Sequence, residues 1–189
     1  MRVLALCGSP RPAGNTAFLL QSLAERVRKL GHTAEVLHLP DLRIQECNGC
    51  LVCEATDCTG DCTLVDDMQA MAVPKLLAAD AVVLGSPTYF DLPSAQIKRF
   101  MDRTNMILSR LTEKKLSFGL VVVGQSGIDS LDATCRALRR YCQICGMTEV
   151  EASPVLAVAR DEGDVRSNPS AMRDTERLAE ALVRARDVP

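Results

Sequence analysis

The sequence predicts an α/β protein with a doubly wound, five-stranded parallel sheet and helices on both faces. Short apolar runs alternate with segments of helical periodicity along the chain. A strand of a parallel sheet is buried on both faces and reads as a continuous apolar run, so strands that alternate with helices indicate such a sheet. With 189 residues and a hydrophobic content of 47%, the chain can bury one sizeable core. We therefore expect a single domain over residues 1–189.

The first half of the chain supplies two of the strands. Residues 3–7 form an apolar run, and the segment after it keeps helical spacing until Gly31. The apolar face of this helix consists of Leu20, Leu23, Val27 and Leu30. A second strand fits residues 34–39. Residues 41–66 have no regular period and contain five of the nine cysteines, so we expect a long functional loop there.

The alternation of helices and strands resumes after this loop. Further helices are expected at residues 67–78, 94–108, 131–145 and 171–186. Further strands are expected at residues 81–85, 118–124 and, with a weaker signal, 148–152. Cys135, Cys142 and Cys145 share one face of the helix at 131–145, whereas a reactive cysteine pair typically opens a helix. We interpret these three cysteines, and Cys7 in the first strand, as buried core residues.

Composition excludes several classes of function. The formal net charge is −2, basic residues form no run, and aromatic residues make up only 3% of the chain with no Trp. We therefore expect no nucleic-acid partner. No apolar stretch reaches the roughly 20 residues of a membrane span, and the N-terminal MRVLALCGSP turns to Gly and Pro too soon for a signal peptide. We expect a cytoplasmic protein without a membrane partner, and in a reducing compartment clustered cysteines indicate metal ligands or redox groups.

The loop after the first strand has the composition of an anion site. Residues 8–16 read GSPRPAGNT and lead into a helix, whose exposed N–H groups, with Ser, Thr and Arg donors, suit a phosphate. Neither the nucleotide-hydrolase pattern Gly-x4-Gly-Lys-Ser/Thr nor the dinucleotide pattern Gly-x-Gly-x-x-Gly is present. The alternative is an ordinary strand-to-helix turn with an Asn or Thr cap.

A second specialised loop follows the third strand. Residues 85–93 read GSPTYFDLP and place Tyr89 and Phe90 beside two prolines. In a doubly wound sheet the loops at the carboxyl ends of strands 1 and 3 flank the crevice that binds a ligand. A flat ring is therefore expected here; the alternative is a hydrophobic loop that packs on its neighbour.

The cysteine loop carries the third motif. Cys47-x2-Cys50-x2-Cys53 is a thiolate triplet of the kind that wraps an iron–sulfur cluster, which needs a fourth ligand nearby. Cys58 and Cys62 are the two candidates. Besides a [4Fe–4S] cluster, structural Zn²⁺ or thiols without a metal remain alternatives.

Three motifs, in matching order over residues 1–150, resemble the flavodoxin-like NAD(P)H-dependent FMN reductases, and specifically their iron–sulfur flavoprotein branch. The motifs are GSPRPAGNT, GSPTYFDLPSAQIKRFMDR and CNGCLVC with the following CTLVDDM. The resemblance implies a flavodoxin-like sheet of order 2-1-3-4-5. It implies that the FMN phosphate is held by Ser9, Arg11, Asn15 and Thr16. It implies that the isoalloxazine is contacted by Pro87, Thr88, Tyr89 and Phe90, and by the loop with Gly124 and Gln125, which is shorter here than the common Gly-rich version.

The resemblance also indicates where the fourth cluster ligand stands, but two criteria point to different cysteines. The spacing after the third cysteine favours Cys58, whereas the position just before Asp66-Asp67-Met68 favours Cys62. We choose Cys62 and keep Cys58 as the alternative. The implied assembly is a homodimer or homotetramer in which each cluster faces the FMN of a neighbouring subunit.

The predicted function is that of an FMN-binding oxidoreductase with a [4Fe–4S] cluster, which moves electrons between a donor such as NAD(P)H or a ferredoxin-like protein and a small-molecule or protein acceptor. We name no catalytic side chain because the chemistry belongs to the cofactors. Three alternatives are an NAD(P)H-dependent FMN or quinone reductase without a cluster, a flavodoxin-like electron carrier, and a zinc-binding module.

Overall fold

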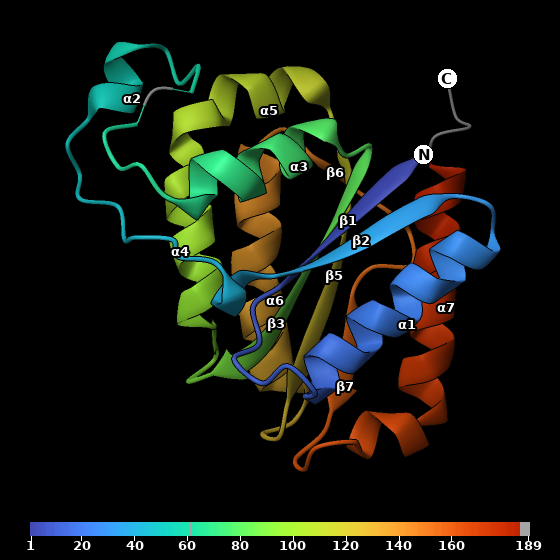
Figure 1. Cartoon of the computed structure of the whole chain (residues 1–189). Helices are drawn as coiled ribbons and strands as arrows, with labels where there is room; N and C mark the ends of the chain where they lie inside the picture. The colour runs from blue at the N-terminus through green and yellow to red at the C-terminus, as the bar shows by residue number, and fades with distance from the viewer. Residues whose placement is uncertain (61, 186–189) are drawn as a thin grey trace.

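A computed structural model describes residues 1–60 and 62–185 of the chain (Figure 1). The central sheet has the strand order β2-β1-β3-β5-β6, with β7 also paired to β5, and these pairs are parallel. The strands are β1 (Arg2–Cys7), β2 (Thr33–His38), β3 (Ala81–Tyr89), β5 (Ser117–Gly124), β6 (Thr148–Glu149) and β7 (Val155–Val158). A two-residue strand, β4 (Leu92–Pro93), pairs antiparallel with the end of β3. The predicted flavodoxin-like order 2-1-3-4-5 is confirmed, with β6 and β7 sharing the fifth position.

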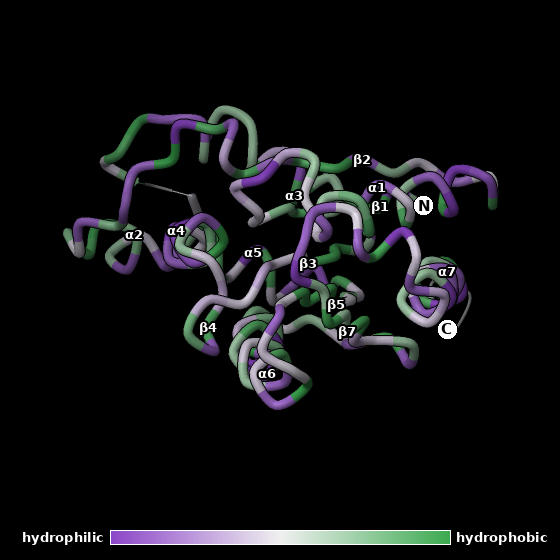
Figure 2. Tube along the Cα trace, turned by 90° about the horizontal axis from the view of Figure 1, so that it is seen from below, coloured by the Kyte–Doolittle hydropathy of each residue, from purple (hydrophilic) through white to green (hydrophobic). Residues whose placement is uncertain are grey.

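Helices cover both faces of this sheet. The α-helices are α1 (Asn15–Lys29), α2 (Val52–Ala55), α3 (Val73–Ala78), α4 (Ala95–Arg103), α5 (Leu108–Lys114), α6 (Ile128–Ile144) and α7 (Pro169–Arg184). Short 3₁₀ helices are η1 (Leu39–Asp41), η3 (Thr104–Ile107) and η4 (Asp164–Ser167), and η2 (Met68–Ala72) is a π-helical turn. Figure 1 shows α1 and α7 together on one side of the strands. In Figure 2 the helices α4, α6 and α7 are seen nearly end-on beside the strands.

The two faces of the sheet form two apolar clusters. In β1, Leu4 and Leu6 point into the cluster under α3, α4 and α6, whereas Val3 and Ala5 point into the cluster under α1 and α7. Successive residues are therefore buried on opposite faces, which explains the continuous apolar run in the sequence. The cysteines expected in the core are there: Cys7, Cys135, Cys142 and Cys145 are all buried. Burial raises the pKa of the Cys135 and Cys145 thiols to about 11.

The fifth strand differs from the prediction of residues 148–152. Within residues 148–152 the strand is limited to β6, and the Val150 N–H then donates to the Phe118 carbonyl. The next N–H of β5 in this ladder, that of Leu120, donates to the side-chain oxygen of Ser153. This side chain occupies the place of a strand carbonyl, so the ladder is interrupted until β7 resumes it.

Helix boundaries also differ in places. The helix predicted at 94–108 is α4, which gives way to η3 and then α5. The C-terminal helix predicted at 171–186 is α7, which starts at Pro169 and ends at Arg184; residue 186 lies outside the described residues. The predicted loop at 41–66 contains one helical turn, α2, and its residue 61 is likewise outside the described part. Among the described residues, no helix is both long and apolar enough to cross a lipid bilayer.

Candidate functional site

A pocket of about 740 Å³ opens at the carboxyl ends of β1, β3, β5 and β7. Every residue that the sequence suggested for flavin binding lines it: Ser9, Arg11, Asn15, Thr16, Pro87, Thr88, Tyr89, Phe90, Gly124 and Gln125. These residues come from three loops that are far apart in the chain. The doubly wound fold brings them together because parallel strands end at the same edge of the sheet.

The loop between β1 and α1 forms the cationic end of the pocket. The Ser9 hydroxyl accepts from the backbone N–H of Arg11 and donates to the Arg11 carbonyl, both at 3.2 Å, and this turns the loop back on itself. A Cβ on Gly14 would lie 2.9 Å from Arg11 Cβ, so the turn needs glycine there. Within the fully described α1, no side chain caps the N-terminus and no acidic residue stands in the first turn. The positive helix end and Arg11 together favour an anion.

Asn15 lines the pocket, but its side-chain amide is bonded to protein. Its Nδ2 donates to the Asp161 carbonyl at 2.8 Å, and its Oδ1 accepts from the Gly163 N–H at 2.9 Å. Asn15 thereby fixes the loop after β7, which contributes Arg160 and Glu162 to the lining. The sequence prediction missed this loop because it ended the fifth strand before Ser153.

The loop after β3 forms the opposite wall. It is a hairpin in which Thr88 pairs with Pro93 and Tyr89 with Leu92. Phe90, at the tip, adopts a φ of 52°, in the left-handed region that two-residue hairpins require. Its side chain is fully exposed, and that of Tyr89 is 45% exposed. Apolar surface therefore rims the mouth of the pocket.

Hydrogen bonds and close packing hold the pocket loops together. The Gly8 N–H donates to the Gly85 carbonyl at 2.8 Å, and the Ser94 hydroxyl donates to the Gly8 carbonyl at 2.6 Å. On the other side, a Cβ on Gly124 would lie only 2.2 Å from Thr88 Cγ2. The end of β5 can therefore approach the loop after β3 only with glycine at this position.

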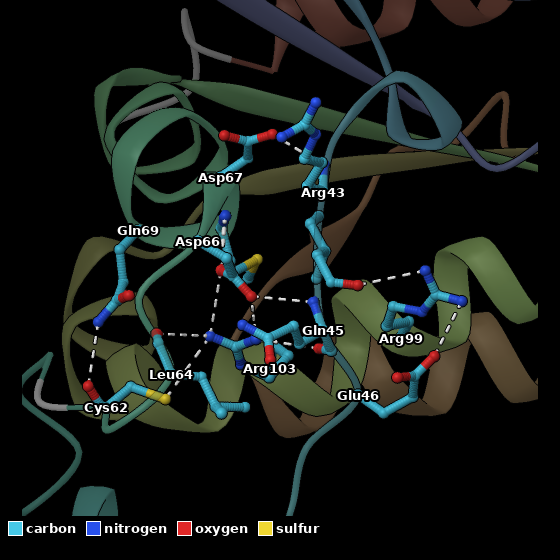
Figure 3. A network of polar contacts seen from close by, with 12 residues as sticks. Arg43, Gln45, Glu46, Cys62, Leu64, Asp66, Asp67, Gln69, Arg99 and Arg103 are labelled. Atoms are coloured by element: carbon cyan, nitrogen blue, oxygen red, sulfur yellow. Dashed lines mark hydrogen bonds and ion pairs between the residues drawn. The ribbon is translucent and has the colours of Figure 1, made fainter.

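The cysteine segment leaves and re-enters the fold at one point. The Arg43 N–H donates to Asp67 Oδ2 at 2.8 Å, and the Asp67 N–H donates back to the Arg43 carbonyl at 3.2 Å. Next to them, the Gln45 N–H donates to Asp66 Oδ2 at 2.9 Å (Figure 3). We call these contacts among Arg43, Gln45, Asp66 and Asp67 the neck of the loop.

Arg103, the last residue of α4, is the centre of the network beneath the loop (Figure 3). Its ion pair with Asp66 measures 2.7 Å, and the side chains are only 1% and 5% exposed. The guanidinium also donates to the Gln45 carbonyl at 2.9 Å and to the Leu64 carbonyl at 3.2 Å, so it joins both arms of the loop. Burial alone would raise the pKa of the Asp66 carboxyl, but hydrogen bonds from Arg103 and from the Gln45 and Met68 N–H groups lower it.

The five loop cysteines lie in different environments. Cys47 and Cys50 are exposed, whereas Cys53, Cys58 and Cys62 are half-buried. In residues 1–60 and 62–185, no three His, Cys, Asp or Glu side chains are gathered closely enough to hold a metal ion. The loop therefore presents its thiols separately here.

Three of these thiols have polar side-chain partners. Asn105 Nδ2 lies 3.3 Å from Cys53 Sγ, and Arg103 Nη2 lies 3.6 Å from Cys62 Sγ. The Thr63 hydroxyl, 3.3 Å from Cys50 Sγ, lowers the pKa of that thiol. Burial, together with the charges of Cys53, Glu54 and Asp57, raises the pKa of Cys58.

The region that carries the three motifs also matches known proteins. A family model described as NADPH-dependent FMN reductase matches residues 1–161. The chain belongs to the NADPH-dependent FMN reductase family. This confirms the resemblance that the three motifs carried, and with it the predicted class, the flavin-dependent oxidoreductases.

Relatives of this FMN reductase family member include proteins named iron-sulfur flavoproteins. One from Archaeoglobus fulgidus is 45% identical over 106 residues, which span 56% of this chain and 50% of the relative. Another, from Methanocaldococcus jannaschii, is 32% identical over 150 residues, which span 79% of this chain and 76% of the relative. The match thus spans about half the length of the Archaeoglobus protein.

A solved structure supports the fold. The flavodoxin, WrbA-like protein from Agrobacterium tumefaciens superposes with a TM-score of 0.65 at 19% identity, over 97% of this chain and 98% of its own. At that identity the likeness concerns the fold of this FMN reductase family member.

Sequence reasoning missed three residues of the cysteine-loop environment: Asp66, Arg103 and Asn105. Asp66 and Arg103 stand inside the quoted motifs, at DDM and at the end of KRFMDR. A charged residue in a helical pattern normally indicates a solvated face, so nothing in the pattern indicated a buried ion pair.

Proposed function

We propose that the protein is an FMN-dependent oxidoreductase that binds FMN in the pocket and one [4Fe–4S] cluster on the cysteine loop. It would pass electrons between a reduced donor, NAD(P)H or a ferredoxin-like protein, and an acceptor. The observation that carries the proposal is the convergence of all ten suggested flavin residues on one pocket. The proposal treats residues 1–189 as one domain, because both apolar clusters are built on the same sheet.

The pocket suits FMN in size and in chemistry. Its volume of about 740 Å³ lies within the usual range for cofactor sites. Arg11, Ser9, Thr16 and the N-terminus of α1 would bind the phosphate, and Asn15 would hold the adjacent loop in place. The ring would lie against Pro87–Phe90 on one side and Gly124 and Gln125 on the other.

The cysteine loop suits an iron–sulfur cluster by its donor set. Cys47, Cys50, Cys53 and Cys62 would supply four thiolates, and the N–H donors of Arg103 and Asn105 would stabilise negative charge on two of them. Cys58 would be the alternative fourth ligand. The names of the relatives support this assignment.

Together the two cofactors would convert two-electron transfer into one-electron transfer. When bound, FMN would accept an electron pair as a hydride, whereas the cluster would exchange single electrons. The chain's own part is to bind and orient them and to set the charge around them. No side-chain acid or base is needed for this, so we assign no catalytic residue.

A second candidate is a flavin reductase of the same family without a cluster. The observation that favours it is the separate placement of the loop thiols, which form no metal-binding group among the described residues. In that case the cysteines would stay free thiols.

We also propose that the protein forms a homodimer or homotetramer in the cytoplasm. The exposed apolar side chains of Tyr89, Phe90 and Leu92 at the pocket mouth support an assembly that covers them. A reducing compartment would keep the proposed ligands as thiols.

The deciding experiment is anaerobic purification followed by quantification of FMN, iron, sulfide and zinc per chain. The proposal expects one FMN and about four iron and four sulfide, with flavin reduction by NAD(P)H or by a reduced ferredoxin. Flavin without iron supports the second candidate. Zinc without flavin contradicts both.

A further inference from the structure

The end of α4 and the following η3 present two N–H donors to two loop thiols. Arg103 Nη2 lies 3.6 Å from Cys62 Sγ, and Asn105 Nδ2 lies 3.3 Å from Cys53 Sγ. The two donors are two residues apart in the chain, and the two thiols both pack on the same apolar cluster. The contacts of Cys58, in comparison, involve its backbone: its N–H donates to the Cys53 carbonyl, and its carbonyl accepts from Ser109.

Arg103 is an unusual residue to find at this depth. A guanidinium that is 1% exposed loses most of its hydration, and only a buried partner such as Asp66 makes this tolerable. Two backbone carbonyls, of Gln45 and Leu64, accept further hydrogen bonds. Within the described part of the chain, Arg103 Nε is buried without a partner. The network therefore offers one donor more than the described chain uses.

We propose that Arg103 and Asn105 are positioning residues of the proposed cluster site, which hold Cys62 and Cys53 in place and keep the reduction potential of the cluster higher than the thiolates alone would set it. This inference rests on the proposed function. An N–H donor stabilises negative charge on sulfur, and the site carries more negative charge after it has taken one electron. The donors therefore favour the reduced state.

Asp66 distinguishes this proposal from a purely structural role, because it predicts a shift of the reduction potential in the opposite direction. Its carboxylate compensates the charge of Arg103, so what reaches Cys62 is the field of an ion pair and not of a bare cation. Removal of the donors should lower the potential, whereas neutralisation of Asp66 should raise it. A general loosening of the loop would not produce shifts of opposite direction.

The test measures cluster content and cluster potential separately in the full-length, anaerobically reconstituted protein. Iron and sulfide are quantified first, and the cluster is then titrated with dithionite and redox mediators and followed by its electron paramagnetic resonance signal. The main variants are Asn105→Ala, Arg103→Lys and Asp66→Asn. Arg103→Lys keeps the charge but lacks the planar fork that reaches Asp66 and Cys62 together.

Two neighbours provide matched controls. Arg99 lies one helical turn earlier on α4 and binds the same loop, at the Ile44 carbonyl and the Glu46 carboxylate. Gln69 contacts Cys62 itself, but at the carbonyl, 3.2 Å away, and not at sulfur. Arg99→Met and Gln69→Ala should leave the potential unchanged.

We expect Asn105→Ala and Arg103→Lys to retain iron and to lower the equilibrium constant for reduction about threefold to tenfold, about 28 to 59 mV for a one-electron couple. Asp66→Asn should shift it upward. Full iron with an unchanged potential in Asn105→Ala overturns the inference, as does a downward shift in Asp66→Asn. If Arg103→Lys does not fold, the potentials of Asn105→Ala and Asp66→Asn decide whether the inference holds. Wild type without iron refutes the cluster itself, which is a different result from a cluster whose potential ignores the donors.

Discussion

The Ser94 hydroxyl donates to the Gly8 carbonyl across 2.6 Å and so joins the start of α4 to the end of β1. The same oxygen accepts from the Ile97 N–H at 3.4 Å as the N-cap of α4, and Ser94 is completely buried. Together with the hydrogen bond from the Gly8 N–H to the Gly85 carbonyl, this side chain joins the two loops that form the main walls of the pocket.

The first prediction follows from this contact. Ser94→Ala removes a helix cap and leaves the Gly8 carbonyl without its donor, so it should destabilise the protein by about 2 kcal/mol. FMN affinity should fall as well, because the two walls lose one of the hydrogen bonds that join them. Urea unfolding of the apoprotein and fluorimetric FMN titration measure both effects. Ser22→Ala, which removes a hydroxyl bonded to the Phe18 carbonyl within α1, is the control and should change FMN affinity little.

The second prediction concerns the anion end of the pocket. Replacing Arg11 and Thr16 together by Ala should release FMN and leave the fold intact, since each lost phosphate contact costs about 1 to 3 kcal/mol. Arg28→Ala, at the other end of α1, removes the same charge and should retain flavin. Unchanged FMN affinity in the double variant would mean that the phosphate lies elsewhere. Circular dichroism verifies that the variants are folded.

The third prediction tests the close approach of β5 to the loop after β3. Gly124→Ala places a Cβ 2.2 Å from Thr88 Cγ2 and should cost about 1 to 3 kcal/mol while weakening FMN binding. Adding Thr88→Ser removes that methyl group and keeps the hydroxyl, which contacts Thr134. The double variant should therefore recover part of the loss. No recovery would show that the nearby Leu131, and not Thr88, limits the space.

The fourth prediction concerns the fourth ligand. Cys62→Ser should lose iron and keep FMN, because the Cys62 thiol receives a hydrogen bond from Arg103, which also holds Asp66 at the neck of the loop. Cys58→Ser should keep both cofactors. Iron and flavin assays on anaerobically prepared protein distinguish the two. The reverse pattern would assign the ligand to Cys58, and equal loss would indicate a role other than a single cluster ligand.

The pocket could be predicted from local sequence because each of its loops follows an apolar run and carries its own Gly, Pro and hydroxyl residues. Ser9 and Thr88 needed only the rule that parallel strands end at one edge. Asn15 could be placed in the pocket from the sequence. Its hydrogen bonds to Asp161 and Gly163 could not be predicted from any local pattern, because these residues are more than 140 positions away in the chain.

The region beneath the cysteine loop was harder to predict for a physical reason. Arg103 and Asp66 are charged residues in polar surroundings of the sequence, and only tertiary packing reveals that they neutralise each other in the interior. The fifth strand was misjudged in a similar way, since a single side chain, Ser153, takes the hydrogen bond that would have continued it.

The neck of the loop has a consequence for how freely the cysteine segment can vary. Because the chain departs and returns at hydrogen-bonded neighbours, the part of the loop between Gln45 and Asp66 can change in length without moving β2 or α3. A change of length within this part would alter the number and spacing of the cysteines and leave the pocket at the carboxyl ends of the strands in place. The cysteine segment and the pocket can therefore change independently of each other.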